Sequence, residues 1–183
     1  MTIITKEISE VTLSSEDPES FWNGDNLLRR DPYEASMVEI GRSLVAGAGE
    51  GIFLKQEVEA DTVVAFYNGI RPMDTGSDDW EECAYRIFMR KEDAEDDQDD
   101  QDILDIPSHL RDVSQYAATL AHKVNHSFRP NCRFSDFHHP LHGLIRSVVT
   151  LQRLEAGAEL YVHYNYSLED CPDWYSALWE NIE

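Results

Sequence analysis

The chain has 183 residues, and 42% of them are hydrophobic, which suits one compact domain with a substantial core. Acidic residues outnumber basic ones by 36 to 15, and the formal charge of −21 repels phosphates, which argues against direct binding of nucleic acid. No apolar run reaches the ~18 residues of a membrane span and no signal peptide is recognisable, so we expect an intracellular protein. Three cysteines without a CxxC pair indicate neither a disulfide framework nor a structural metal.

The acidic balance itself has two interpretations. It attracts Lys- and Arg-rich partners by electrostatic steering, or it only keeps the protein soluble. Charge alone favours solubility, and the first interpretation gains weight only beside a site that takes a cationic substrate.

Turn signals divide the chain into a lead-in and a strand-rich core. Residues 1–35 contain Pro18, Gly24 and Asp31-Pro32, which predict a lead-in and not a second folded domain. Short strand-like runs follow, and they are broken by turns. We predict strands at 37–40, 51–54, 62–67, 85–89, 103–106, 132–137, 144–151 and 159–164. Asn68-Gly69 predicts a hairpin turn after the third strand, because both positions tolerate positive φ.

Helical signals are few. Asp112 begins a capping-box spacing, and apolar residues recur at helical intervals as far as Ala121, which predicts one short amphipathic helix. Pro172 begins a predicted C-terminal helix that carries Trp174 and Leu178. No GxGxxG motif, P-loop or internal repeat is present, so a Rossmann-type cofactor fold is not supported. The expected fold class is mainly β (α+β), with short sheets.

Three segments contain residue types that bind cofactors and substrates. They are AGEGIF at 48–53, HKVNHSFRPNC at 122–132 and ELYVHYNY at 159–166. Their order and separation resemble the SET-domain family, in which the second and third segments thread past one another to form a knot-like active site. The resemblance covers about residues 31–179 and is strongest to histone lysine methyltransferases with MORN repeats before the SET domain. No such repeat precedes these segments here, so we expect either a lone catalytic domain or part of a longer chain.

The resemblance implies a protein lysine methyltransferase that takes its methyl group from S-adenosylmethionine. The residues that it assigns to the cofactor are Ala48, Glu50, Lys123, Asn125, His126 and Trp174. The residues that it assigns to catalysis are Tyr164, beside the reacting atoms, and Tyr67, Tyr166 and Phe134, along the lysine channel. Taken singly, the motifs have ordinary interpretations, as a turn at 49–51, strand-face packing of tyrosines and a buried tryptophan. Their joint occurrence favours the catalytic interpretation, without a metal.

The tyrosines fit the chemistry of lysine methylation. A lysine amine is mostly protonated at neutral pH, because its ordinary pKa is about 10.4. An aromatic channel and the nearby sulfonium of the cofactor both disfavour the ammonium form. Methyl transfer needs amine, methyl and sulfur nearly in line, so orientation carries much of the rate. Neutral tyrosines are poor bases, so we expect Tyr164 to orient the amine and not to be required to remove its proton.

The sequence departs from its MORN-type relatives at three places. Phe134 stands where the relatives have a channel tyrosine, which predicts a product that is at least dimethylated. Leu178 stands where they have an acidic cofactor contact, with Glu180 as an imperfect substitute. Residues 91–102 are almost entirely acid and amide, and charge repulsion predicts a solvated loop that is longer than theirs.

The expected organisation is a lead-in at 1–35, a SET domain at 36–167 and a C-terminal helical segment at 168–183 that closes over the channel. The expected substrate is a histone tail or another basic protein, bound by a monomer in the nucleus or cytoplasm. A catalytically silent SET module that binds basic tails is the main alternative. A strand-rich acidic interaction domain with accidental motif matches is another. Binding of S-adenosylmethionine discriminates among them.

Overall fold

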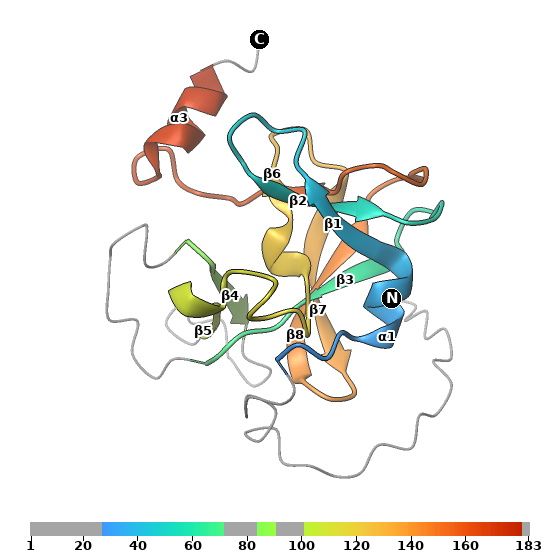
Figure 1. Ribbon diagram of the computed structural model, residues 1–183. Helices are drawn as coiled ribbons and strands as arrows, with labels where there is room; N and C mark the ends of the chain where they lie inside the picture. The colour runs from blue at the N-terminus through green and yellow to red at the C-terminus, as the bar shows by residue number, and fades with distance from the viewer. Residues whose placement is uncertain (1–26, 72–83, 91–100, 181–183) are drawn as a thin grey trace.

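The computed structural model describes residues 27–71, 84–90 and 101–180 (Figure 1). The strands are β1 (Val38–Arg42), β2 (Glu50–Leu54), β3 (Val63–Tyr67), β4 (Arg86–Arg90), β5 (Gln101–Asp105), β6 (Asn125–His126), β7 (Cys132–His139), β8 (Gly143–Thr150) and β9 (Tyr161–Val162). The helical elements are α1 (Pro32–Met37), the 3-10 turns η2 (Ser108–Leu110) and η3 (Ala121–Lys123), and α3 (Asp173–Glu180). The mainly β fold class is confirmed, and every predicted strand overlaps an observed one. Most of the predicted lead-in and of the predicted acidic loop lies outside the described residues.

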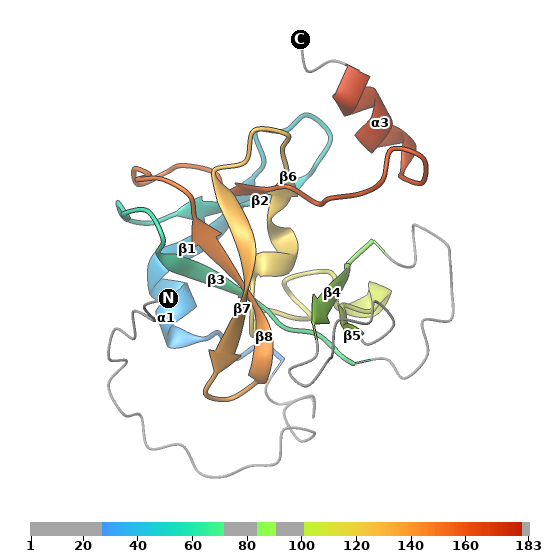
Figure 2. The ribbon, with the colours of Figure 1, turned by 180° about the vertical axis from the view of Figure 1, so that it is seen from behind.

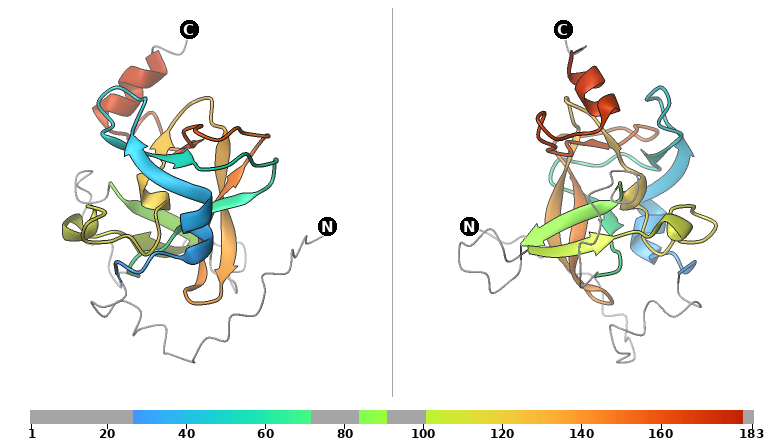
Figure 3. Two further views of the ribbon diagram at one scale, coloured as in Figure 1. Left: turned by 45° about the vertical axis from the view of Figure 1, so that its right-hand side comes forward. Right: turned by 90° about the vertical axis from the view of Figure 1, so that its left-hand side faces the viewer.

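The strands pair into small sheets. β3, β8 and β7 form a three-stranded antiparallel sheet in that order, and the long β7–β8 ribbon is plain when the molecule is seen from behind (Figure 2). β1 pairs with β2 and β4 with β5, both antiparallel, whereas the two-residue strands β6 and β9 pair in parallel. The turned views show α3 projecting from the body of the domain at the end away from the β7–β8 turn (Figure 3).

The core gathers around β3. Its residues from Val64 to Tyr67 are consecutive and all buried, so both faces of the strand are covered. α1 and η3 both contact β3, and the apolar side chains of Leu120 and Val148 complete the packing. The unbroken apolar run in the sequence therefore corresponds to a strand without a solvent face.

Helix α1 was not predicted, although its first residues are typical of a helix start. Asp31 caps the helix, since its side chain accepts a 2.8 Å hydrogen bond from the backbone N–H of Glu34, and Pro32 stands at the first helical position. Six residues are too few for a 3.6-residue periodicity to become visible. The helix begins inside the predicted lead-in.

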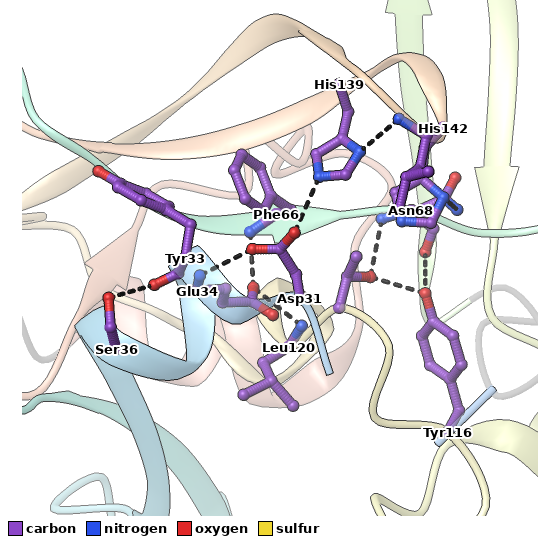
Figure 4. A network of polar contacts seen from close by, with 12 residues as sticks. Asp31, Tyr33, Glu34, Ser36, Phe66, Asn68, Tyr116, Leu120, His139 and His142 are labelled. Carbon is purple, nitrogen blue, oxygen red and sulfur yellow. Dashed lines mark hydrogen bonds and ion pairs between the residues drawn. The ribbon is translucent and has the colours of Figure 1, made fainter. Parts of the chain in front are cut away.

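The N-terminal part of α1 takes part in a buried polar network (Figure 4). Glu34 is fully buried, and its Oε1 accepts the backbone N–H of Phe66 at 2.7 Å and that of Leu120 at 3.0 Å. Asp31 contacts the Nε2 atom of His139 at 3.2 Å, which joins the helix start to β7. A single short helix thus connects β3, β7 and the segment before η3.

The predicted Asn68-Gly69 hairpin is wrong. β3 pairs with β8 and not with the next strand, and the chain continues from Gly69 into a bridge between Ile70 and Asp105. Gly69 has no positive φ; instead, a Cβ atom there would lie 2.5 Å from the carbonyl oxygen of Asp105. The glycine permits close approach of two backbones, a requirement that local turn chemistry does not reveal.

The predicted helix from Asp112 is also wrong. Asp112 does cap a turn, because its side chain accepts the N–H of Ser114 and its carbonyl accepts the N–H of Tyr116. The N–H groups of Ala117 and Ala118 then bond to the carbonyl of Leu27, so the chain leaves the helical path after one turn. Residues 116–122 are all buried, and this tertiary burial overrides the local helical pattern.

No helix within the described ranges is long and apolar enough to cross a membrane.

Candidate active site

The three predicted segments meet where β6 and β9 pass each other. Asn125 pairs with Tyr161 and His126 with Val162 in parallel register, and the N–H of Ser127 extends the pairing to the carbonyl of Val162 at 2.9 Å. The glycine-containing segment joins them, because the N–H of Leu160 bonds to the carbonyl of Ile52 at 2.8 Å. Segments more than 100 residues apart in sequence thus share one site.

A cleft of about 2130 Å³ opens beside this crossing. Every residue that the sequence predicted for the site lines it, namely Tyr67, Phe134, Tyr164, Tyr166, Ala48, Glu50, Lys123, Asn125, His126 and Trp174. The fold therefore brings all the predicted side chains to one cavity, although their individual roles stay predictions.

Tyr164 is fixed at both of its ends by the 124–126 segment. Its backbone N–H donates to Nδ1 of His126 at 3.2 Å, and its hydroxyl donates to the carbonyl of Val124 at 2.7 Å. Its ring meets that of Tyr166 edge-on at 5.6 Å. Burial raises the pKa of the Tyr164 hydroxyl, and the nearby Tyr166 and Tyr85 raise it further. The hydroxyl is therefore neutral at physiological pH.

The imidazole of His126 contacts Tyr164 through its ring and through a hydrogen bond. Because Nδ1 accepts a hydrogen bond, the neutral ring carries its proton on Nε2. Burial, together with the neighbouring His163, lowers the pKa of His126 to about 4. The rings of Phe128 and Tyr175 pack on it at 4.4 and 4.7 Å. A neutral, enclosed imidazole suits positioning better than proton transfer.

Tyr67 and Phe134 form a second aromatic wall. The two rings meet edge-on at 6.1 Å, with Tyr67 on β3 and Phe134 on β7. The hydroxyl of Tyr67 donates to the carbonyl of Tyr85, a residue whose part in the site sequence reasoning did not detect. Burial raises the pKa of Tyr67 well above its ordinary value, and the nearby Tyr164 adds to the shift. Both channel hydroxyls are thus neutral and bonded to backbone carbonyls.

A glycine loop and an ion pair also line the cleft. Gly47 and Gly49 have φ values of 82° and 75°, and a Cβ at either position would meet nothing within 4 Å. Ala48 is exposed at the tip of this loop. Nζ of Lys123 lies 2.8 Å from Oε2 of Glu50, so one positive and one negative group lie side by side in the lining of the cleft.

The two asparagines of the NHSFRPN motif, Asn125 and Asn131, join separate backbone segments through their side-chain amides. Nδ2 of Asn125 donates to the carbonyl of Glu50 at 2.8 Å and to Oγ of Ser43 at 3.0 Å. Asn131 donates to the carbonyl of Glu159 and accepts the N–H of Tyr161, both at 2.8 Å. The two amides therefore fasten the crossing segments. The buried side chain of Glu159 belongs to the same network, and sequence reasoning missed it.

Helix α3 supplies the outer wall. Trp174 is 44% exposed and Leu178 40% exposed, and both line the cleft. The Trp174 ring meets those of Tyr164 and Tyr166 edge-on at 6.2 and 6.3 Å. Large apolar side chains are thus presented to the open end of the cavity.

The bases along the cleft are paired with acids. Arg86 lies 3.3 Å from Asp105, and Arg146 lies 2.7 Å from Asp136 while it also donates to the carbonyl of Phe88. Within the described ranges, no cluster of His, Cys, Asp and Glu side chains could hold a metal ion.

Comparisons with known proteins agree with this geometry. A family model described as SET domain matches residues 49–165. The chain is 35% identical over 191 residues to a protein of Halocynthia roretzi described as histone-lysine N-methyltransferase SETD7; the match covers 94% of this chain and 47% of that protein. The chain therefore spans about half the length of this curated relative.

A solved structure described as ctPRC2 in an autoinhibited conformation bound to S-adenosylmethionine resembles the fold. Its TM-score is 0.50 at 20% identity, and the match covers 80% of this chain and 17% of that chain. At this identity the likeness concerns the fold alone. The β6–β9 crossing, the shared cleft and the match over residues 49–165 together show that the chain belongs to the SET-domain family.

Proposed function

We propose that the protein is a lysine N-methyltransferase that uses S-adenosylmethionine as its methyl donor. The observation that carries this proposal is the fixation of Tyr164 in an aromatic wall, where its backbone N–H donates to His126 and its hydroxyl donates to the carbonyl of Val124. The SETD7 protein of Halocynthia roretzi, a histone-lysine methyltransferase by its description, supports the same reaction. We further propose a relationship to the MORN-repeat members of the family, which is supported by the resemblance of the segments DPYE at 31–34, FYNGIR at 66–71 and DWY at 173–175.

The cleft fits S-adenosylmethionine. The amino-acid part of this cofactor carries one positive and one negative charge, and Glu50 and Lys123 offer the complementary pair. Gly47 and Gly49 leave room for a ligand to approach the backbone. Trp174, exposed at the mouth of the cleft, offers a face for the adenine ring. When bound, the cofactor supplies an electrophilic methyl group on a sulfonium.

The aromatic walls prepare the lysine amine for attack. Tyr67, Tyr164 and Tyr166 line the cleft with aromatic rings, which would lower the pKa of an entering ammonium by desolvation. Because the hydroxyls of Tyr67 and Tyr164 already donate to carbonyls, their oxygens can accept N–H bonds from the amine and orient its lone pair. Orientation of this kind is worth several kcal/mol.

We propose a basic protein such as a histone tail as the substrate, methylated in the nucleus or cytoplasm by a monomer with a role in chromatin. The formal charge of −21 supports a cationic partner, now that a site for a cationic side chain can be named. Phe134 supports a product beyond monomethyl-lysine, because it places no hydroxyl opposite Tyr67.

Incubation of histone and non-histone proteins with the chain and S-adenosylmethionine, followed by mass spectrometry, tests the proposal. We expect lysine residues to gain one or more methyl masses. A silent SET module that binds basic tails is favoured by one observation, the apolar Leu178 in the wall where an acidic cofactor contact is expected. Calorimetry separates the two: no binding of S-adenosylmethionine at millimolar concentration would contradict the methyltransferase and leave the silent module.

A further inference from the structure

A buried carboxylate stands at the junction of the glycine loop and the strand crossing. Glu159 is only 3% exposed. Its Oε1 accepts from Oγ of Ser43 at 2.6 Å and from Nδ2 of Asn125 at 3.2 Å. Its Oε2 accepts from the N–H of Leu44 and from the hydroxyl of Tyr161, both at 2.7 Å. Donors from three separate segments therefore converge on one side chain.

These donors form the base of the glycine loop. Ser43 and Leu44 directly follow β1, and Oγ of Ser43 in turn accepts the N–H of Val45 at 3.0 Å. The N–H of Ser43 closes the loop on the carbonyl of Gly49 at 2.9 Å. The course of the chain from β1 to β2 thus depends on where the carboxylate of Glu159 lies.

The carboxylate of Glu159 lies where a side chain at position 51 would begin. A Cβ atom on Gly51 would lie 2.2 Å from Oε1 of Glu159 and 3.1 Å from Nδ2 of Asn125. Gly51 and Gly49 are therefore glycines for different reasons. Gly49 adopts a positive φ, whereas Gly51 leaves space for the carboxylate of Glu159.

We propose that Glu159 is a positioning residue for the cofactor, which shapes the 43–50 loop and the Lys123 side of the cleft without contacting the cofactor itself. The inference rests on the proposed use of S-adenosylmethionine. A carboxylate can accept all four hydrogen bonds, whereas a glutamine would present its own N–H groups to some of the same donors. Burial works to raise the pKa of Glu159, but the hydrogen bonds from Ser43, Tyr161, Leu44 and Asn125 outweigh it and lower the pKa, so the group is ionised at neutral pH.

This assignment also changes the role of Asn125. Its Nδ2 atom is shared among Ser43, the carbonyl of Glu50 and Glu159. The side-chain amide therefore acts as a second fastener of the loop, and Asn125 serves the cofactor through the loop that it holds.

Glu159→Gln tests the proposal, with Glu39→Gln as the matched control, because Glu39 is exposed on β1 and its substitution removes the same charge. Calorimetry with S-adenosylmethionine should show about tenfold or weaker binding in Glu159→Gln and unchanged binding in Glu39→Gln. Hydrogen exchange at the Leu44 amide in the cofactor-free protein should accelerate only in Glu159→Gln. With cofactor varied, its KM should rise while kcat at saturation stays within about twofold.

Two further variants keep the test decisive if Glu159→Gln folds poorly. Ser43→Ala removes one donor and should weaken cofactor binding by a smaller factor, with little change in Tm. Glu159→Asp keeps the charge but shortens the reach, and it should also weaken binding. Unchanged cofactor affinity in Glu159→Gln, or a Leu44 amide as protected as before, would overturn the inference. A wild-type protein that binds no S-adenosylmethionine would instead contradict the proposed function.

Discussion

At the scale of single residues, the site uses backbone carbonyls to place aromatic side chains. Tyr164 donates to Val124 and Tyr67 donates to Tyr85, so each hydroxyl points to a fixed partner before any substrate arrives. The remaining capacity of each oxygen is as an acceptor, which is what an amine requires.

Tyr164→Phe should therefore reduce turnover much more than stability. We expect kcat to fall by about 10²-fold or more, because a preorganised polar group is lost, and the unfolding free energy to fall by only about 1 kcal/mol for one hydrogen bond. Tyr33→Phe is a suitable control, since the Tyr33 hydroxyl also donates to a backbone carbonyl, that of Val63. Steady-state kinetics and thermal denaturation measure both effects. Full activity in Tyr164→Phe would remove this tyrosine from its role.

Phe134→Tyr should shift the product toward monomethyl-lysine. The wild-type ring faces Tyr67 edge-on and has no hydroxyl, so the channel has no group here to hold a water against the amine. A tyrosine adds that group and takes up volume that a methyl needs, about that of one water. Product ratios after long incubation of a good peptide substrate decide the matter. Strictly monomethyl product from the wild type would contradict the prediction.

At the scale of elements, short pieces of structure are joined through buried polar side chains. α1 is only six residues long, yet Glu34 on it connects β3 and the segment before η3 (Figure 4). Burial raises the pKa of Glu34 to about 8, although the N–H groups of Phe66 and Leu120 act to lower it. The carboxyl is thus mostly protonated in the folded protein at neutral pH.

This raised pKa predicts a pH-dependent stability. Between the ordinary value of 4.5 and about 8, the folded state binds a proton that the unfolded state has lost. The contribution of Glu34 is therefore full below pH 4.5 and is lost as pH rises toward 8, with a slope of at most about 1.4 kcal/mol per pH unit. Denaturant titrations give the unfolding free energies of wild type and Glu34→Gln between pH 5 and 8. Plotted against pH, the two free energies should converge or cross, because the wild type loses stability as pH rises. Parallel curves would show that Glu34 does not titrate in this range.

At the scale of the whole molecule, the charge is strongly acidic while the cleft is locally balanced. Arg86, Arg146 and Lys123 each lie beside an acid, so the bases at the site do not repel a cationic substrate as lone charges would. With the proposed basic substrate, we expect the surplus of acids to act at longer range, as a field that attracts basic chains from solution.

Added salt should accordingly slow the association of basic peptides. Raising ionic strength from about 0.05 to 0.5 M shortens the Debye length and screens steering between separated charges, while the desolvated cofactor contacts are screened less. Stopped-flow measurements should show an association rate that falls several-fold for a Lys- and Arg-rich peptide and stays constant for a neutral one. Calorimetry should give nearly the same cofactor affinity at both salts. Equal salt dependence for the two peptides would argue that the acidity serves solubility.

The sequence by itself was enough to predict nearly all of the strands and to name the candidate residues of the site. Apolar runs bounded by turns are local signals, and they marked every strand except the two-residue β6. The motif residues Asn125, His126 and Tyr164 carried enough chemistry to predict one shared site, and all three line the same cleft. The site could be predicted because this combination of residue types is unusual in a protein sequence.

Only the tertiary structure decided how these parts are held. The 112–121 segment follows a helical pattern, but burial on all sides and bonds to Leu27 outweigh a local preference worth less than about 1 kcal/mol per residue. Gly69 and Gly51 are required by atoms of Asp105 and Glu159 that lie far away in sequence. In the sequence, a buried carboxylate such as Glu159 cannot be told from any other acidic residue. Its hydrogen-bond donors identify it, and they come from segments that only folding brings together.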